Sequence, residues 1–271
     1  MQVNFGPVRV FIGSGEASRI ERKTLISTLR RHCSRELDIW VFNGTHNAIE
    51  RNAELPVLAP LPLHLKYRNY TEFSLYRFLI PQLCGHEGRA IWLDSDTISL
   101  GDIAELFDRE MQGADLLAKP DYGDQRWATS VVLFDCSTCR FDLEGIFCEI
   151  NAGLYSYADF TQLSPAYLKH HPHSVAALEE RWNSFDHFDN QTQILHYTNL
   201  NQQPWKYPGH PAGGLWFRCF REAIADGTVS EEDIEISIAR TYVRSTIRDG
   251  NRPGPWWWRG VKRRIRGLIT G

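Results

Sequence analysis

The sequence has 271 residues and is poor in the features that mark several protein classes. No stretch reaches the roughly 18 consecutive apolar residues that a membrane-spanning helix needs. The first residues lack the charged and then apolar regions of a secretory signal. Six cysteines are too few for a disulfide scaffold and fit a reducing compartment. The net charge of −3 provides no overall basic field, so we expect no nucleic-acid partner.

The residues that are present describe a globular domain followed by a distinct tail. Hydrophobic residues make up 42% of the chain, which excludes global disorder. We predict one domain over residues 1–250 and a tail over residues 251–271. Residues 252–271 contain six Lys or Arg, no acid, and a run of three tryptophans at 256–258. This composition is typical of a helix that lies in a membrane interface. The alternatives are a solvated terminus and a tail whose tryptophans dock on the domain.

Short apolar runs alternate with amphipathic segments along the predicted domain. The predicted strands cover residues 8–12, 38–42, 89–93, 114–118, 130–134 and 193–197. The predicted helices cover residues 16–31, 72–83, 216–226 and 230–244. This alternation indicates an α/β fold with a mostly parallel central sheet. Ligands of such sheets bind beyond the carboxyl ends of the strands, so functional side chains are expected directly after strands.

Two carboxylates, Asp94 and Asp96, follow the predicted strand at 89–93. Alternation in an extended chain directs both side chains toward one side. Two hard oxygen ligands suit Mg²⁺ or Mn²⁺, and such an ion can hold a diphosphate. Two other interpretations remain open. The pair can be an acidic turn with an aspartate capping residues 101–107, or an Asp-x-Asp pair like that of haloacid-dehalogenase-type phosphatases, in which the first Asp is a nucleophile.

A second polar group follows the predicted strand at 193–197. His196 can supply a neutral imidazole to a metal ion, and Lys206 can meet a phosphate as a point charge. A lone histidine is more often structural, so the interpretation of His196 depends on the residues around it. Together with the earlier motifs, these residues occur in a familiar order. The motifs are residues 76–81 (YRFLIP), 91–96 (IWLDSD), 101–103 (GDI), 105–107 (ELF), 195–197 (LHY) and 204–205 (PW).

This ordered set resembles the glycogenin-like glycosyltransferases of family eight, which have the GT-A fold. The resemblance covers roughly residues 7–245, and it implies retaining transfer of a sugar from a nucleotide donor, usually a UDP-sugar. It also implies roles for individual residues. Asp94, Asp96 and His196 would bind Mn²⁺ or Mg²⁺. Arg77 would contact the donor phosphate or sugar, Ile12, Gly13 and Ser14 would touch the nucleoside, and Asp159 would lie near the transferred sugar.

The chain departs from the family pattern at several positions. The family often reads His-x-x-Gly-x-x-Lys-Pro-Trp, whereas Asn199 replaces the glycine here and Gln203 precedes Pro204. Lys206 follows the tryptophan, so either Lys206 or Gln203 takes the place of the phosphate-binding lysine. The sugar-contacting Asn-(Ser/Ala)-Gly element appears as residues 128–130 (ATS), and the Asp-Gln element appears as Asp159-Phe160. The identity of the donor sugar therefore cannot be inferred from the family.

The sequence as a whole favours a metal-dependent, retaining glycosyltransferase that uses a UDP-sugar and a glycan or lipid-linked acceptor. Arg77 is expected to assist the leaving diphosphate, and Asp159 is the one candidate for a covalent nucleophile. We favour attack from the same face, assisted by the leaving phosphate. The expected location is cytoplasmic, with the tail on the inner face of the membrane. The alternatives are the phosphatase and an inactive protein that binds nucleotide-sugars or glycans.

Overall fold

The computed structural model describes residues 6–52, 54–60, 71–121 and 125–250. Its centre is an eight-stranded sheet with the strand order β4-β3-β2-β1-β5-β8-β7-β9. In that order the strands are Val57–Leu58, Ala48–Arg51, Leu37–Asn43, Val8–Ser14, Arg89–Asp94, Arg126–Asp135, Leu116–Asp121 and Val175–Ala177. All strands except β3 and β8 share one direction, which confirms the mostly parallel sheet.

A second, three-stranded sheet lies beside the first and has the order β10-β11-β6. Its strands are Ser184–Phe185, Ile194–His196 and Thr97–Ser99. Strand β6 follows β5 after a two-residue turn, and it pairs antiparallel with β11. This small sheet therefore brings a late segment of the chain to the carboxyl end of β5.

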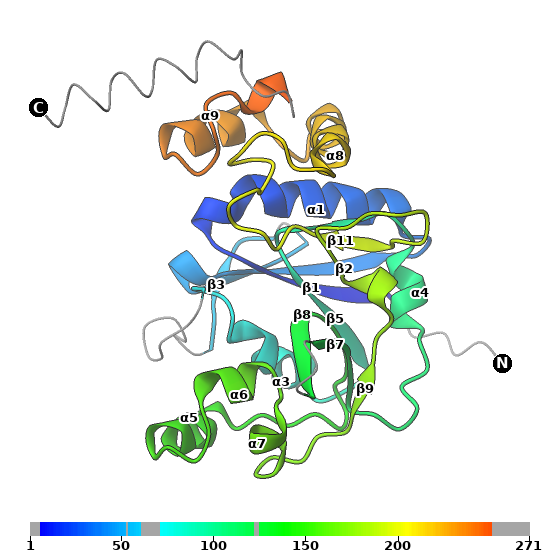
Figure 1. Ribbon diagram of the computed structural model, residues 1–271, viewed down its shortest axis with the longest axis vertical. Coiled ribbons are helices and arrows are strands. Elements are labelled where there is room, and N and C mark those ends of the chain that lie inside the picture. The colour runs from blue at the N-terminus through cyan, green and yellow to red at the C-terminus, as the bar shows by residue number, and fades with distance from the viewer. Residues whose placement is uncertain (1–5, 53, 61–70, 122–124, 251–271) are drawn as a thin grey trace, which may run out of the picture.

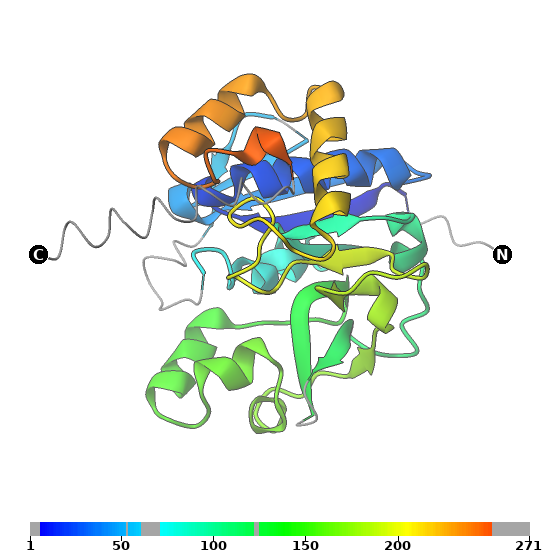
Figure 2. The same cartoon turned by 45° about the horizontal axis from the view of Figure 1, so that its top comes forward.

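Helices cover both faces of the large sheet (Figure 1). On one side lie α1 (Arg19–His32) and α4 (Ile103–Phe107), with α8 (Gly213–Ala225) and α9 (Glu231–Ala239) stacked outside α1. On the other side lie α3 (Ile80–Leu83), α5 (Leu143–Asn151), α6 (Tyr157–Thr161) and α7 (Pro165–Leu168). Figure 2 shows the same layers after rotation, with α8 crossing the end of α1. Short 3₁₀ turns complete the described chain: Glu16–Ser18, Gly44–His46, Tyr76–Leu79, Glu180–Trp182 and Ile247–Asp249.

Burial explains why the central strands are apolar on both faces. Along β1, Phe11 packs on the side of α3 and α5–α7, whereas Val10 and Ile12 pack on the side of α1 and α4. Trp92 and Leu93 divide in the same way along β5. A third apolar cluster joins α1 to α8, α9 and β11. Because helices cover both faces, the strands read as continuous hydrophobic runs rather than as alternating patterns.

The structure corrects several predicted boundaries. The predicted helix 72–83 is a 3₁₀ turn at Tyr76–Leu79 followed by the short α3, because Pro81 lies in the first turn of α3 and favours a helix start there. The predicted helix 230–244 ends at Ala239. Strand β8 begins four positions earlier than predicted, at Arg126 rather than at residue 130. The helices α5–α7 were not predicted, and neither were the short strands β3, β4, β6, β9 and β10.

Candidate active site

The predicted metal ligands meet at the carboxyl end of β5. Asp94 is the last residue of β5, and Asp96 lies in the turn before β6. His196 ends β11, where it pairs with Thr97 of β6. The Nε2 atom of His196 lies 3.0 Å from Oδ1 of Asp96. One ligand atom from each of the three residues lies within 4.8 Å of the others, so together they can hold a metal ion. This is the arrangement expected from the sequence.

Neighbouring polar groups hold His196 and Asp96 in place. The Nδ1 atom of His196 lies 3.2 Å from Oδ1 of Asn183. If Nδ1–H donates to this oxygen, the lone pair of Nε2 faces the carboxylates, as metal coordination requires. Gln203 is buried and donates from Nε2 to Oδ2 of Asp96 at 3.3 Å. The side chains of the cluster are therefore held in a defined arrangement rather than forming a loose acidic surface.

Asp94 is connected to the side of the site that faces β8. It accepts hydrogen bonds from Nε1 of Trp92 at 2.7 Å and from Arg77 at 3.1 Å. The guanidinium of Arg77 also donates to the backbone oxygen of Ser74 at 2.9 Å and to Oγ1 of Thr129 at 2.7 Å. Its side chain is buried and lies over the ring of Trp92. Arg77 thus contacts Asp94 and also lines the cavity described below.

The charges at the cluster are not balanced. Burial raises the pKa of Asp94, and the nearby Asp96 raises it further, although Arg77 acts in the opposite direction. Burial alone would lower the pKa of His196, but the carboxylates of Asp96 and Asp94 raise it above its usual value. Both shifts have the same cause: the two carboxylates lie close together, and additional positive charge between them would be stabilising. A divalent cation would meet that need and would compete with protons for the same atoms.

The predicted nucleoside loop lies next to the cluster. Strand β1 runs parallel to β5, with Gly13 opposite Asp94. A side chain at Gly13 would collide with the ring of Trp92, since an added Cβ would lie 2.3 Å from it. The side chain of Ile12 is fully buried on the α1 side of the sheet. Ser14 accepts a hydrogen bond at Oγ from the buried Arg22 at 3.2 Å.

Two polar residues of α1 in this region were missed from the sequence. They are Arg22 and Glu21, and both are buried. Burial raises the pKa of Glu21 to about 8, and none of the described residues forms a hydrogen bond with its Oε2 atom. The signal was present in the sequence, since both polar residues sit among the inward positions Ile20, Thr24 and Leu25.

Gln203 and Lys206 have different environments. Gln203 reaches Asp96, as described above. The side chain of Lys206 is exposed, and its backbone N–H donates to the oxygen of Gln203 at 2.9 Å. Its charge still acts on Glu21 and lowers the pKa of that carboxyl against the effect of burial. Gln203 therefore lies beside Asp96, and Lys206 lies at the surface.

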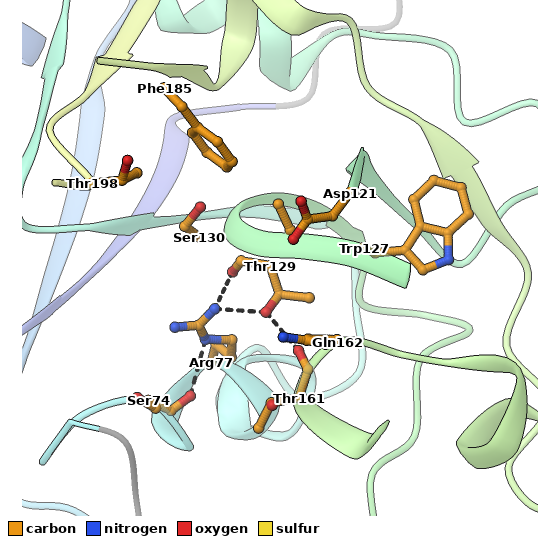
Figure 3. Close-up of a pocket in the computed structure, with 11 residues that line it drawn as sticks. Ser74, Arg77, Asp121, Trp127, Thr129, Ser130, Thr161, Gln162, Phe185 and Thr198 are labelled. Carbon is orange, nitrogen blue, oxygen red and sulfur yellow. Dashed lines mark hydrogen bonds between the residues drawn. The ribbon is translucent and has the colours of Figure 1, made fainter. Parts of the chain in front are cut away.

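A cavity of about 280 Å³ opens on the β8 side of Arg77 (Figure 3). Its wall combines polar groups with the rings of Trp127 and Phe185, a composition suited to a sugar ring and its hydroxyls. Asp121, at the end of β7, also lines it and was missed from the sequence. The remaining lining residues are Ser74, Arg77, Ala128, Thr129, Ser130, Thr161, Gln162 and Thr198. The motif at 128–130 is therefore part of this wall.

Asp159 precedes two residues of the cavity wall, Thr161 and Gln162, in the sequence. Its carboxylate oxygens, however, are engaged in structural hydrogen bonds. It is the third residue of α6 and completes a capping box with Ser156. One oxygen accepts from Arg126 at 3.0 Å and from Ser164 at 2.8 Å. The other accepts from the backbone and side chain of Ser156. Burial would raise the pKa of Asp159, but these hydrogen bonds and Arg126 hold it below its usual value. Its neighbour Phe160 is fully buried in the core.

Solved structures provide the comparison that sequence searches do not. No protein-family model and no curated protein matches the chain. A galactosyltransferase, LgtC, solved with donor and acceptor sugar analogues, superimposes with a TM-score of 0.59 at 16% identity, over 83% of this chain and 98% of LgtC. The chain has the GT-A glycosyltransferase fold.

Two further glycosyltransferases share this fold. The bifunctional enzyme WbbM matches with a TM-score of 0.58 at 16% identity, over 85% of this chain. GlyE of Streptococcus pneumoniae matches with a TM-score of 0.57 at 16% identity, over 87% of this chain. The chain spans about half of WbbM, 51%, and 65% of GlyE. In each case the match covers most of this chain but only part of a longer protein.

The predicted membrane tail, residues 251–271, lies outside the described residues. Within the part that is described, none of the helices combines the length and the hydrophobicity needed to cross a bilayer.

Proposed function

We propose that the protein is a metal-dependent, retaining glycosyltransferase that moves a hexose-type sugar from a UDP-sugar to a glycan or lipid-linked acceptor. The observation that carries this proposal is the cluster of Asp94, Asp96 and His196 next to a polar and aromatic cavity, whose lining residue Phe185 contacts the ring of His196. Arg77 connects the two, because it bonds to Asp94 and lines the cavity. The GT-A fold supports the same function.

The residues present fit a divalent cation. Asp94, Asp96 and His196 would hold Mn²⁺ or Mg²⁺, which would neutralise the charge that grows on the diphosphate as the sugar leaves. Asn183 and Gln203 orient two of the three ligands. Arg77 adds a fixed positive charge next to Asp94, and it is held there by Ser74 and Thr129 before any substrate binds.

The state of Asp159 supports attack from the same face rather than a double displacement. A double displacement needs a free carboxylate beneath the anomeric carbon. The oxygens of Asp159 instead accept from Ser156, Ser164 and Arg126, and Asp159 is absent from the cavity wall. Retention would then come from an acceptor that attacks on the side of the departing phosphate. Mass spectrometry that detects a glycosyl adduct on Asp159 would contradict this.

Calorimetry with nucleotides tests the donor site. We expect wild type to bind UDP in the presence of Mn²⁺ and to bind it far more weakly with a chelator. Asp96→Ala is expected to lose the effect of Mn²⁺, whereas Asp108→Asn, which changes an exposed acid at the end of α4, is expected to keep it. Failure of wild type to bind UDP with Mn²⁺ would overturn the proposal.

The tail would place the enzyme on the inner face of the cytoplasmic membrane, since six basic residues and three tryptophans suit an anionic interface. Deletion of residues 252–271 should abolish co-sedimentation with anionic liposomes and leave UDP binding intact. Liposome binding that survives the deletion would contradict this part of the proposal.

One alternative has an observation in its favour. The position beside the metal ligands carries the neutral Gln203, and Asp159 is not free to react. A protein that binds nucleotide-sugars without transferring them would fit both facts. UDP-sugar binding without donor hydrolysis, in the presence of Mn²⁺ and a broad acceptor panel, would favour it. A phosphatase is less compatible, because Asp94 is tied to Arg77 and Trp92 instead of being free as a nucleophile.

A further inference from the structure

A carboxylate that neither strand supplies lies at the carboxyl ends of β1 and β2. Strands β1 and β2 run parallel, and Ser14 lies opposite Asn43 at their carboxyl ends. In doubly wound nucleotide-binding folds, an acid after the second strand binds a ribose hydroxyl. Here β2 is followed by Gly44, Thr45 and His46, none of which is an acid. A nucleotide bound over β1 would therefore lack this partner if only the two strands and their loops contributed.

Glu72 reaches this place from a distant segment of the chain. Its Oε1 atom lies 2.6 Å from Oγ1 of Thr45. Oγ1 of Thr45 already accepts from the backbone N–H of Glu16 at 2.8 Å, so the hydroxyl proton is available to Glu72. Among the described residues, Oε2 of Glu72 has no hydrogen-bond partner, and the residue is half-buried. The carboxylate is held at one oxygen and open at the other.

Two glycines make this approach possible. An added Cβ at Gly15 would lie 1.6 Å from Oε1 of Glu72, and one at Gly44 would lie 2.1 Å from its backbone oxygen. Any side chain at either position would push Glu72 away from the ends of β1 and β2. The loops after β1 and β2 are therefore shaped to receive this one residue.

Glu16, the first acid after β1 in the sequence, is engaged in ion pairs. Its carboxylate pairs with Arg19 and with Nε2 of His46, the latter at 3.2 Å. Burial would raise the pKa of Glu16, but these two partners lower it, so it is an ionised and engaged group. Glu72 is thus better placed than Glu16 to accept hydrogen bonds from a ligand.

We propose that the carboxylate of Glu72 binds the ribose hydroxyls of the nucleotide donor. Two vicinal hydroxyls can donate to the open carboxylate oxygen and to the one shared with Thr45. A charged acceptor strengthens each of these hydrogen bonds. This inference rests on the proposed function, because it assigns the ribose subsite of the same donor site. Glu72 is then the residue that distinguishes a ribonucleotide from a deoxyribonucleotide.

The test compares UDP with 2′-deoxy-UDP by calorimetry in the presence of Mn²⁺. Wild type is expected to bind UDP about tenfold more tightly, which is the usual size for one charge-assisted hydrogen bond. In Glu72→Ala the ratio should fall to near one through weaker UDP binding. Glu72→Gln should give an intermediate ratio. Glu235→Gln, which changes an exposed acid on α9, serves as the matched control and should keep the wild-type ratio.

Each outcome decides one question. A ratio that Glu72→Ala leaves unchanged, with wild type binding UDP, overturns the inference and leaves the proposed function intact. An equal loss of UDP and 2′-deoxy-UDP binding also overturns it, because the carboxylate would then contact the base or support the loop. Thermal unfolding of each variant identifies a loss that comes from misfolding, and Glu72→Gln, which keeps the side-chain shape, provides the ratio in that case. Absence of UDP binding in wild type overturns the donor site and this inference together.

Discussion

Two acidic regions of this protein look alike in sequence but differ in the structure. At the end of β5, Asp94 and Asp96 converge on His196, and the three side chains could together hold a metal ion. At the start of α6, Asp159 has both oxygens filled by Ser156, Ser164 and Arg126. The pKa of Asp94 is raised by burial, whereas hydrogen bonds lower the pKa of Asp159 against the effect of burial. Asp94 and Asp96 lie close enough to repel each other, whereas both oxygens of Asp159 face hydrogen-bond donors.

The largest effect on the first region is expected when its imidazole is removed. His196→Ala takes away one of three ligands and leaves Asp94 and Asp96 facing each other. We expect Mn²⁺ affinity to fall by more than about 100-fold, because removing even an indirect partner of a metal ligand costs 10- to 100-fold. Calorimetric titration with Mn²⁺ measures it. Affinity within a few fold of wild type would show that His196 is not a ligand.

Acid should affect the two regions in different ways. Metal ligands bind in their deprotonated forms, and the fold raises the pKa of both His196 and Asp94. Mn²⁺ affinity should therefore fall as the pH falls through the raised pKa of His196, by about tenfold per pH unit for each proton displaced. Mn²⁺ titrations at several pH values, in buffers of different ionisation enthalpy, would count these protons. Affinity that does not depend on pH would contradict the assignment of His196.

The pKa shifts of His196 and Asp159 predict that pH has opposite effects on the stability of the metal-free protein. Since the fold raises the pKa of His196, its contribution is present at low pH and is lost as the pH rises through that pKa. Since the fold lowers the pKa of Asp159, its contribution is present above the pKa of the unfolded chain and is lost as the pH falls through the folded value. Denaturant unfolding of wild type and of Asp159→Asn across acidic pH would separate the two. Equal pH dependence in both proteins would contradict the second assignment.

A smaller effect is expected from the residue that orients Asp96. Gln203→Ala removes the hydrogen bond to Oδ2 of Asp96 and should weaken Mn²⁺ binding by about tenfold. Lys206→Ala is the matched control, because its side chain is exposed and bonds to none of the three ligands. The control should leave Mn²⁺ affinity unchanged. The reverse order of effects would show that Lys206 acts at the metal cluster.

The smallest effect at the metal is expected from Asp159→Asn. This substitution weakens a capping box and an ion pair with Arg126, so the free energy of unfolding should fall by about 1 kcal/mol. Mn²⁺ affinity should match wild type, since Asp159 is not part of the cluster. Thermal unfolding and Mn²⁺ calorimetry on the same preparation test both parts. A large loss of Mn²⁺ affinity would place Asp159 in the donor site.

Much of the site was predictable because its signals are local. An apolar strand that ends in Asp94-Ser95-Asp96 indicates where the carboxylates must lie. The order of motifs around His196, through the family resemblance, predicted that His196 joins these two carboxylates. Glu72 and Asp121 were missed because nothing in their local sequence shows which strand ends they approach. Their positions depend on how distant segments pack against β2 and β8.

The resemblance to family eight implied His196 as a candidate metal ligand, whereas the α/β fold, the mostly parallel sheet and the pair Asp94 and Asp96 could be predicted from the residues alone. These follow from hydrophobic periodicity and from polar residues placed directly after strands, both of which are short-range properties. The folded structure was needed to show that Gln203 rather than Lys206 reaches Asp96, that the oxygens of Asp159 are occupied, and that Glu72 lies against Gly15. Hydrogen-bond satisfaction depends on which atoms meet after the chain folds, and that information is not carried by any single segment.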